Sequence, residues 1–467
     1  MDRRLLNSRW PYAAAAFAMV AVFIFSQVRI VSDPRPLGSV ADIASLSQRS
    51  DLNVLFVLID TLRADRLSGY GYERETSPNI DRLAASGVRF AHNLSQSSWT
   101  KSSMASLWTG LYPARTGVLR FAHAVPPQAR MPAETLREAG FRTAALWRNG
   151  WVAPNFGFNQ GFEFYTSPRP GPVPPKLRRE NPSIQLPGTD LDIVRSADEF
   201  LLSYGKGERW LLYLHLMDAH QYVSDEESAR FGTSYSDIYD NSIHWVDRNI
   251  GALLASLARH GLLERTLIVL ASDHGEAFGE HGTEGHARNL YGEVTETPLI
   301  LSFPFRLEPG LVVRSATENV DIWPTVLDLL DLPPLVRADG RSLVAEIEAA
   351  ARGADLVRED DPRFAQLDRT WGRTRASPQP VVAVTEGRYR GIHYATEPEQ
   401  FELYDLEQDP EEQSNAAPDH PAVAARLRAR VDAHLAEAEP PWEGGAPEVE
   451  LDDLMLQQLR ALGYKLD

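Results

Sequence analysis

The chain has 467 residues, a formal net charge of −17, 43% hydrophobic residues and no cysteine. The missing cysteines exclude disulfides, thiolate zinc sites, iron–sulfur clusters and a cysteine nucleophile, which leaves metal binding to His, Asp, Glu and hydroxyl groups. The acidic balance argues against nucleic acid as a partner, because binding to phosphates needs clustered cations.

Residues 10–28 form a stretch without charges, WPYAAAAFAMVAVFIFSQV. As a helix it would span about 28 Å, close to the thickness of a bilayer's hydrocarbon core. Arginines precede it, which predicts a cytoplasmic N-terminus and a catalytic part outside the cytoplasm. A cleaved secretory signal is the alternative, but such signals have a shorter apolar segment and end in a small-x-small site rather than SQVR. We predict a single-pass membrane anchor over residues 1–31 and a polar linker over 32–51.

Five short apolar runs indicate strands, at residues 54–59, 143–147, 210–216, 267–271 and 299–303. None alternates with period two, as expected for parallel strands that helices cover on both faces. Helical patterns fall between them, for example at 77–86 before Gly87 and at 239–260 before Gly261. The alternation predicts a doubly wound α/β domain over residues 52–350.

Polar side chains follow three of these runs, at the ends where ligands bind in open α/β sheets. They are Asp60, Asp218, His220, Asp273 and His274. Taken singly, Asp60 would be read as a helix cap, His220 as a structural histidine, and Thr100 as the N-cap of a helix over 101–107. Acidic residues and imidazoles at three strand ends instead predict one crevice.

An ordered series of segments resembles the sulfatase family of the alkaline phosphatase superfamily. The series is NVLFVLIDTLRADRLSGYG (53–71), SPNIDRLAASGVRF (77–90), SSWTKSSMASLWTGLYPARTGV (97–118), TLREAGFRTAAL (135–146), YLHLMDAH (213–220), TLIVLASDHGEAFGEHG (266–282), LYGEVTETPLI (290–300) and ENVDIWPTVLDLLDL (318–332). GRYRGIHY (387–394) and FELYDLEQDPEE (401–412) look like that family's strand-rich C-terminal subdomain. The resemblance covers residues 52 to about 435.

The resemblance implies an alkaline-phosphatase-like doubly wound sheet with a smaller C-terminal α+β subdomain. We place that subdomain at 351–438. A tail follows at 439–467, in which an apolar stripe over 451–462 predicts a short amphipathic helix.

The same resemblance implies a metal ion and a nucleophile that binds it. Asp60 corresponds to one metal-binding aspartate, and Asp273 with His274 to a second metal-binding pair. Counting back from the Thr109-Gly110 pair that ends the helix places the nucleophile, which is also a metal ligand, at Thr100.

The chain departs from the usual sulfatase at this position. Sulfatases have a Cys or Ser that is converted to formylglycine and is followed by a fixed Pro and Arg, whereas this chain reads TKSSM over 100–104. Asp60 is followed by Thr61, where sulfatases commonly have a second aspartate. One divalent ion is therefore expected, with Zn²⁺ or Mn²⁺ favoured over Ca²⁺ or Mg²⁺ because one ligand is an imidazole.

Such an ion would lower the pKa of the Thr100 hydroxyl, and the N-terminus of a helix would favour the developing anion. We expect His220 to contact the leaving group or the oxyanion. His286 falls where many sulfatases have an active-site lysine. Lys101 is a further candidate for stabilising substrate charge, and Glu276 for holding the metal-binding geometry.

A threonine has no second hydroxyl, so an adduct on Thr100 must be displaced by water or an alcohol, which favours phosphorus esters. We expect a membrane-anchored, metal-dependent hydrolase of sulfuric or phosphoric esters, with a small-molecule, glycan or lipid ester as substrate. Two alternatives stay open. One is a phosphoethanolamine- or phosphoglycerol-type transferase that modifies a lipid or surface glycan, and the other is an inactive sulfatase-fold binding protein. The sequence does not indicate the oligomeric state.

Overall fold

The computed structural model describes residues 19, 33–171, 175–181, 188–356, 361–373, 376–397, 399–451, 456–457 and 459. The predicted anchor over 1–31, apart from Met19, and most of the predicted tail helix over 451–462 lie outside these residues. Within the described ranges, no helix is both long and apolar enough to cross a membrane. The chain divides into two units, Met1–Arg35 and Pro36–Asp467, and the description below concerns the second.

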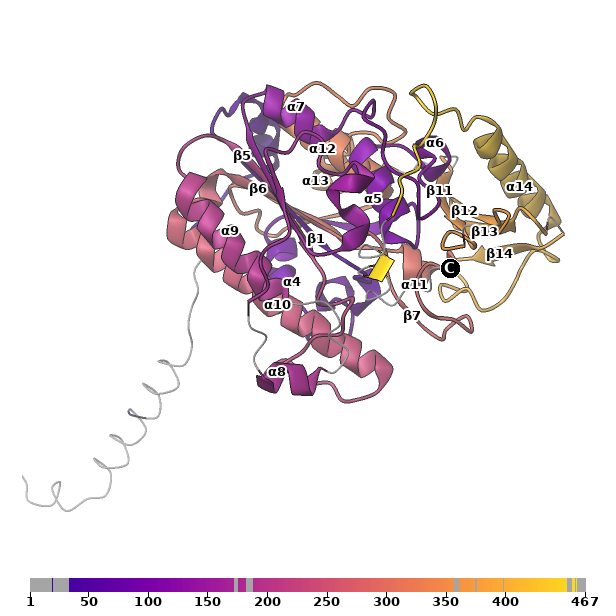
Figure 1. The fold of residues 1–467 in the computed structure, drawn as a ribbon, viewed down its shortest axis with the longest axis horizontal. Coiled ribbons are helices and arrows are strands. Elements are labelled where there is room, and N and C mark those ends of the chain that lie inside the picture. The colour runs from indigo at the N-terminus through magenta and orange to yellow at the C-terminus, as the bar shows by residue number, and fades with distance from the viewer. Residues whose placement is uncertain are drawn as a thin grey trace, which may run out of the picture. The chain divides into compact units, whose positions relative to one another are not determined.

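An eight-stranded mixed sheet forms the centre of this unit, in the order β10-β2-β9-β6-β1-β5-β3-β4 (Figure 1). The strands are β1 (Asn53–Ile59), β2 (Val88–Leu94), β3 (Arg142–Trp147), β4 (Phe164–Thr166), β5 (Trp210–Leu216), β6 (Thr266–Ala271), β9 (Leu299–Ser302) and β10 (Leu311–Glu318). The fully buried β1 lies between β5 and β6 and is parallel to both. Its carboxyl end therefore lies at the same edge as theirs.

The expectation of parallel strands was wrong for the run at 299–303. β9 runs antiparallel to both β6 and β2. A short, fully buried run has the same apolar pattern in either direction, so that pattern carries no information on strand direction. The apolar runs also missed β2 and β10, which alternate buried and partly exposed residues and include charged side chains.

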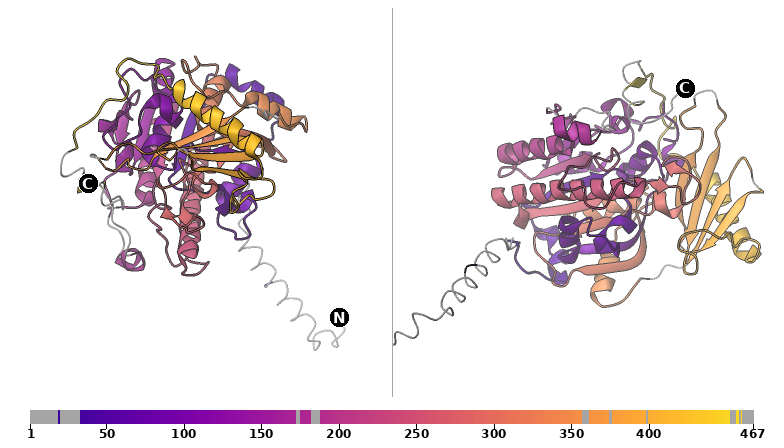
Figure 2. Two further views of the ribbon diagram at one scale, coloured as in Figure 1. Left: turned by 90° about the vertical axis from the view of Figure 1, so that its right-hand side faces the viewer. Right: turned by 90° about the horizontal axis from the view of Figure 1, so that it is seen from below.

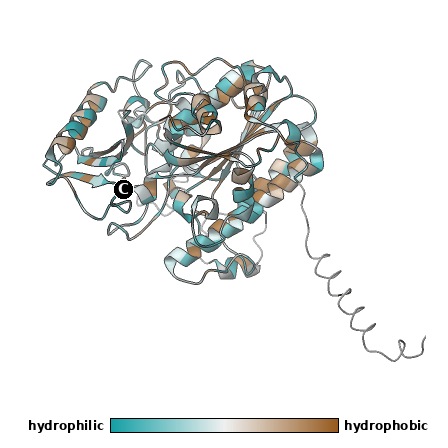
Figure 3. Ribbon diagram, turned by 180° about the vertical axis from the view of Figure 1, so that it is seen from behind, coloured by the Kyte–Doolittle hydropathy of each residue, from teal (hydrophilic) through white to brown (hydrophobic). Residues whose placement is uncertain are grey.

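Helices cover both faces of the sheet, as the two views of Figure 2 show. On β1, Leu55, Val57 and Ile59 join a core cluster with α4 (Pro78–Ala85), α9 (Asp190–Tyr204) and α10 (Tyr235–His260). Val54, Phe56 and Leu58 point to the other face. They join a cluster with α5 (Thr100–Thr109), α7 (Pro132–Glu138), α12 (Ile322–Leu329) and α13 (Val344–Ala351). The central strands are accordingly hydrophobic along their length (Figure 3).

The C-terminal part contains a four-stranded antiparallel sheet of β11 (Arg363–Asp368), β12 (Pro380–Glu386), β13 (Tyr389–Tyr394) and β14 (Phe401–Asp405). On β12, Val382 and Val384 pack with α14 (Pro421–Ala436), whereas Val381 and Ala383 belong to the same core cluster as α5 and α12. This sheet therefore shares a hydrophobic core with the main sheet.

The remaining α-helices and strands are short. They are α3 (Val40–Ala44), α6 (Pro113–Thr116), α8 (Pro175–Glu180), α11 (Gly292–Thr295) and the two-stranded ribbon of β7 (Ala277–Phe278) and β8 (Glu284–Gly285).

Candidate active site

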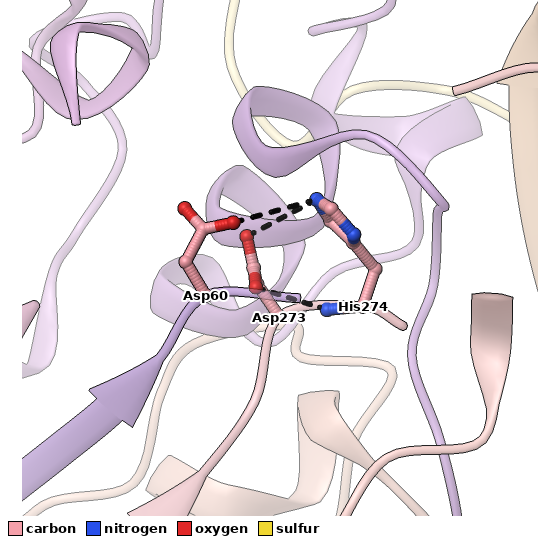
Figure 4. A group of neighbouring side chains, drawn as sticks. All are labelled: Asp60, Asp273 and His274. Carbon is pink, nitrogen blue, oxygen red and sulfur yellow. Dashed lines mark hydrogen bonds and ion pairs between the residues drawn. The ribbon is translucent and has the colours of Figure 1, made fainter. Parts of the chain in front are cut away.

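Asp60, Asp273 and His274 meet where the neighbouring strands β1 and β6 end (Figure 4). Each offers one ligand atom, and these atoms lie within 4.8 Å of one another. His274 Nε2 is 3.4 Å from Asp273 Oδ2 and 4.0 Å from Asp60 Oδ1. All three side chains are fully buried. The structure thus brings together the three residues that the sequence placed at two separate strand ends.

The donor atoms of this group fit a divalent cation. Within the described structure, Asp60 Oδ1 and Asp273 Oδ2 are buried without a hydrogen-bond partner, although such atoms are normally satisfied. The other oxygen of Asp273 accepts from the backbone N–H of Thr61 at 3.2 Å and of His274 at 3.0 Å. Burial and the adjacent Asp60 carboxylate raise the pKa of Asp273 to about 7. A cation between the two bare oxygens would remove this repulsion.

The orientation of His274 suits a metal ligand. Its Nδ1 lies 2.9 Å from the carbonyl oxygen of Gly275. Only a protonated Nδ1 can donate there, so we assign the neutral ring its lone pair on Nε2. Nε2 faces the two carboxylates and also lies 3.1 Å from Thr100 Oγ1, which donates its hydroxyl proton to it.

Thr100 is the first residue of α5, which ends at Gly110 in the left-handed conformation (φ 69°). The preceding Trp99 is extended, so the chain turns into the helix at Thr100 itself. One turn later, Ser103 Oγ donates to the carbonyl oxygen of Asp273 at 2.6 Å. This bond ties the start of α5 to the end of β6 and holds the Thr100 hydroxyl beside the carboxylates.

Two residues that the sequence analysis did not select hold Asp60. His215 Nε2 lies 2.9 Å from Asp60 Oδ2, and its Nδ1 lies 2.6 Å from the Tyr213 hydroxyl. Asn149 Nδ2 donates to the same Asp60 oxygen at 2.6 Å and lies 3.4 Å from Thr100 Oγ1. These bonds occupy Oδ2 and leave Oδ1 facing His274. Although burial alone would raise the pKa of Asp60, the His215 hydrogen bond and the nearby histidines hold it below its usual value.

His220 and His286 lie beside this group. The His286 ring centroid is 4.6 Å from that of His274 and 5.0 Å from that of His220. His286 Nδ1 is 3.2 Å from each carboxylate oxygen of Glu276. Burial lowers the pKa of His286 to about 4 and raises that of Glu276 to about 7. Glu276 thus contacts His286, and its role in holding the metal-binding geometry stays a prediction.

Lys101 extends into an aromatic cage. Its fully buried ammonium donates to the carbonyl oxygen of Phe121 and lies 3.8 Å from the ring centroid of Phe156. The rings of Trp151 and Trp99 are 5.0 and 5.4 Å away. Burial lowers the pKa of Lys101 well below its usual value. These contacts favour a structural role for the ammonium over the predicted role in stabilising substrate charge, and the activity of a Lys101 variant tests which holds.

Asp218 does not join the crevice, contrary to our expectation for the three strand ends. Its Oδ1 accepts from Arg148 at 2.6 Å, and its Oδ2 accepts from the Trp245 indole at 2.7 Å and the Asp190 backbone N–H at 2.8 Å. Asp190 also pairs with Arg148, at 3.0 Å. Asp218 therefore belongs to a buried ion cluster that packs α9 and α10 against the sheet.

The C-terminal part holds the loop that carries Glu276 and His286. His281 Nδ1 lies 2.9 Å from Glu293 Oε1, and its Nε2 lies 3.0 Å from the Glu412 carbonyl oxygen. The Glu412 side chain accepts from Gly292 N at 2.5 Å. Although burial alone would lower the pKa of His281, the Glu293 hydrogen bond raises it to about 9. A charged His281 thus links both sides of the loop to Glu412.

A separate cavity of about 650 Å³ lies between the edge of the main sheet and the C-terminal sheet. Its lining includes Asn93, Arg314, Arg363, Arg388 and Arg390, and none of the predicted site residues. The chemistry at the ends of β1 and β6 is therefore independent of this cavity.

Comparisons with known proteins identify the family and the fold. A family model described as Sulfatase matches residues 52–332, and one described as N-sulphoglucosamine sulphohydrolase, C-terminal, matches 279–438. The choline-sulfatase of Rhizobium meliloti (strain 1021) is 26% identical over 460 residues, covering 82% of this chain and 86% of that protein. A solved 2-O GAG sulfatase has a TM-score of 0.69 at 19% identity, covering 87% of this chain and 96% of that one. The phosphonate monoester hydrolase of Agrobacterium radiobacter has a TM-score of 0.66 at 20% identity, covering 86% and 100%.

Proposed function

Because the chain belongs to the sulfatase family and is a sulfatase-like ester hydrolase, we propose that it cleaves sulfuric or phosphoric esters with Thr100 as a covalent nucleophile. The observation that carries this proposal is the position of the Thr100 hydroxyl. It stands at the N-terminus of α5, 3.1 Å from His274 Nε2 and beside the two bare carboxylate oxygens. A hydroxyl at that place faces both the metal-binding atoms and the positive end of a helix dipole.

Asp60, Asp273, His274 and Thr100 would hold one divalent ion. Such an ion supplies a positive charge that lowers the pKa of a bound hydroxyl and polarises an ester oxygen. His215 and Asn149 orient Asp60, while Ser103 fixes the start of α5 against Asp273. His220 and His286 contact the equatorial oxygens and the leaving alcohol as charge develops on them.

The second step favours phosphorus over sulfur. A formylglycine has a second hydroxyl from which sulfate is eliminated, and the Thr100 side chain has none. The adduct on Thr100 is therefore released by displacement, with water attacking the phosphorus or sulfur atom. The likeness to a phosphonate monoester hydrolase supports phosphorus esters, and the likeness to sulfatases supports sulfuric esters of small molecules or glycans. A panel of both ester types decides between them.

We also propose that the enzyme is anchored in a membrane by residues 10–28 and acts outside the cytoplasm. The support is the charge-free segment with arginines before it. Protease added to spheroplasts should degrade the catalytic part, whereas protection until the spheroplasts are lysed would contradict this location.

The function is tested with metal analysis of the purified protein and a panel of aryl sulfate, phosphate monoester, phosphate diester and phosphonate. We expect one bound divalent ion, and a loss of kcat/KM of at least about 10³-fold in Thr100→Ala. Thr109→Ala is the matched control. It removes the same side chain at the other end of α5, where Oγ1 bonds Ala105 O at 2.7 Å. A protein without stoichiometric metal, or full activity in Thr100→Ala, would overturn the proposal.

A further inference from the structure

Two tyrosines form a paired surface beside the histidines. Tyr222 lies in the turn after β5 and Tyr235 begins α10. Their hydroxyls are 2.7 Å apart, and their ring centroids are 5.3 Å apart. Tyr235 is 39% exposed and packs edge-on against Phe278 with centroids 5.1 Å apart. The Tyr235 ring is therefore fixed by its contact with Phe278, while part of its surface stays exposed to solvent.

This pair borders the candidate active site. Tyr222 follows His220 by two residues, and Phe278 follows Glu276 by two. Glu276 contacts His286, whose ring packs against those of His274 and His220. Burial and then the charge of Glu276 raise the pKa of the Tyr222 phenol, which places its hydroxyl near that carboxylate. An unbroken series of side chains thus leads from His274 to the open face of Tyr235.

The backbone at Tyr222 is strained. Its φ is +53°, a left-handed conformation that is unfavourable for a bulky side chain. Thr61 and Ala287 have φ values of 60° and 59°, and in the described structure they adjoin Asp60 and His286. Strain of this kind persists where the surrounding structure imposes it, often at functional sites. A glycine would relieve it at Tyr222, yet the chain places an aromatic hydroxyl there.

Arg288 adds a positive charge to the same edge. It follows His286 by two residues in the chain, and its side chain is exposed. In the described part of the chain, Arg288 makes no salt bridge with an acidic side chain. On a protein with a net charge of −17, a cation without an acidic partner at this place is suited to hold an anionic group.

We propose that Tyr222, Tyr235 and Arg288 form a subsite for an ester whose alcohol portion is a sugar ring or an aromatic ring. This inference rests on the proposed function and specifies its substrate class as ring-bearing sulfuric or phosphoric esters. The ring stacks on the open face of Tyr235, and its oxygen substituents bond the paired hydroxyls. Arg288 contacts the charged ester group. A sugar and a phenol both present such a ring, and the experiment separates them.

The test measures equilibrium binding by calorimetry to the metal-loaded Thr100→Ala protein, which would not turn the ligands over. The ligands are glucosamine 6-sulfate, 4-nitrophenyl sulfate and methyl sulfate. Tyr235→Ala should raise the Kd of at least one ring ester about 3- to 10-fold and leave methyl sulfate within about twofold. Arg288→Gln should weaken all the ligands that bind. Tyr204→Ala is the matched control, because Tyr204 is also 39% exposed but lies at the end of α9.

Selective weakening of the glucosamine ester identifies a sugar subsite, and selective weakening of the nitrophenyl ester an aryl subsite. Equal effects on ring and methyl esters, no effect of Tyr235→Ala, or no binding of either ring ester would overturn the subsite. Binding is measured without turnover, so this failure is distinct from failure of the proposed function. That failure would appear as full activity in the Thr100→Ala protein or as no activity of the wild type on any ester.

Discussion

Removing the Asn149 side chain should loosen Asp60 and Thr100 together. Asn149→Ala deletes the 2.6 Å bond to the buried Asp60 carboxylate and the 3.4 Å contact with Thr100 Oγ1. Losing a hydrogen bond to a charged group costs about 1.5–3 kcal/mol. Asn149 Oδ1 also accepts from Trp151 N at 2.8 Å, and losing this cap costs about 1 kcal/mol more. The free energy of unfolding should therefore fall by about 2.5–4 kcal/mol.

The same change should weaken metal binding about 10- to 100-fold, because Asp60 Oδ1 faces the site only while Oδ2 is held. Competition with a chromophoric chelator measures the Kd, and urea unfolding of the metal-free protein measures the stability. Asn159→Ala is the control, since it removes an exposed amide from the same loop. If Asn149→Ala binds the metal within about threefold of wild type and unfolds at the same urea concentration, the assigned role of Asn149 is refuted.

Three further changes test the surroundings of the site. Lys101→Met should keep kcat/KM within about tenfold of wild type, because the ammonium contacts Phe121 O and the Phe156 ring. A loss of kcat/KM above about 10³-fold in steady-state assays would instead show that Lys101 acts in catalysis. Asp218→Ala should lower the free energy of unfolding in urea by about 3 kcal/mol, because Arg148 loses a buried counter-ion; an unchanged urea midpoint would contradict this. His434→Leu should reduce the loss of stability as the pH falls. Burial lowers the pKa of folded His434 from 6.5 to about 4. The contribution of the neutral ring to the free energy of unfolding is therefore complete above pH 6.5, and about 1–3 kcal/mol of it is lost as the pH falls towards 4. Equal shifts of the urea midpoint between pH 7 and pH 4.5 in both proteins would refute this expectation.

Strand ends were the most readable feature of the sequence. A fully apolar run such as 54–59 predicts a buried strand, and parallel neighbours must end at one edge, so Asp60, Asp273 and His274 could be expected to meet. The resemblance to the sulfatase family implied Thr100, located by counting back from the Thr109-Gly110 pair, and the structure begins α5 at that residue. Asp218 follows β5 in the same way, yet its carboxylate pairs with Arg148 and does not join the site. Strand position alone does not say which partner a carboxylate finds.

The residues that hold Asp60 were harder to predict. Asn149 lies in a loop without a recognisable motif, and only the fold brings it to Asp60, 89 residues away in the chain. Tyr213 and His215 did carry a signal. They are two apart in a strand whose other residues are Leu and Trp, so both point to one face of it, and buried polar atoms there need hydrogen-bond partners. The pairing of Tyr222 with Tyr235 depends on the turn at Tyr222. The backbone of that turn is left-handed, which a tyrosine rarely adopts, so the sequence does not predict it.

The stereochemical course of the reaction tests the central claim, a covalent step on Thr100, most directly. A phosphate diester made chiral at phosphorus with two oxygen isotopes is hydrolysed in water that carries the third isotope, and the configuration of the chiral monoester product is determined. Each in-line displacement inverts the centre. Attack by Thr100 followed by attack of water gives two inversions, so we expect net retention of configuration at phosphorus. Net inversion would show that water attacks the ester directly, and it would contradict a nucleophilic Thr100.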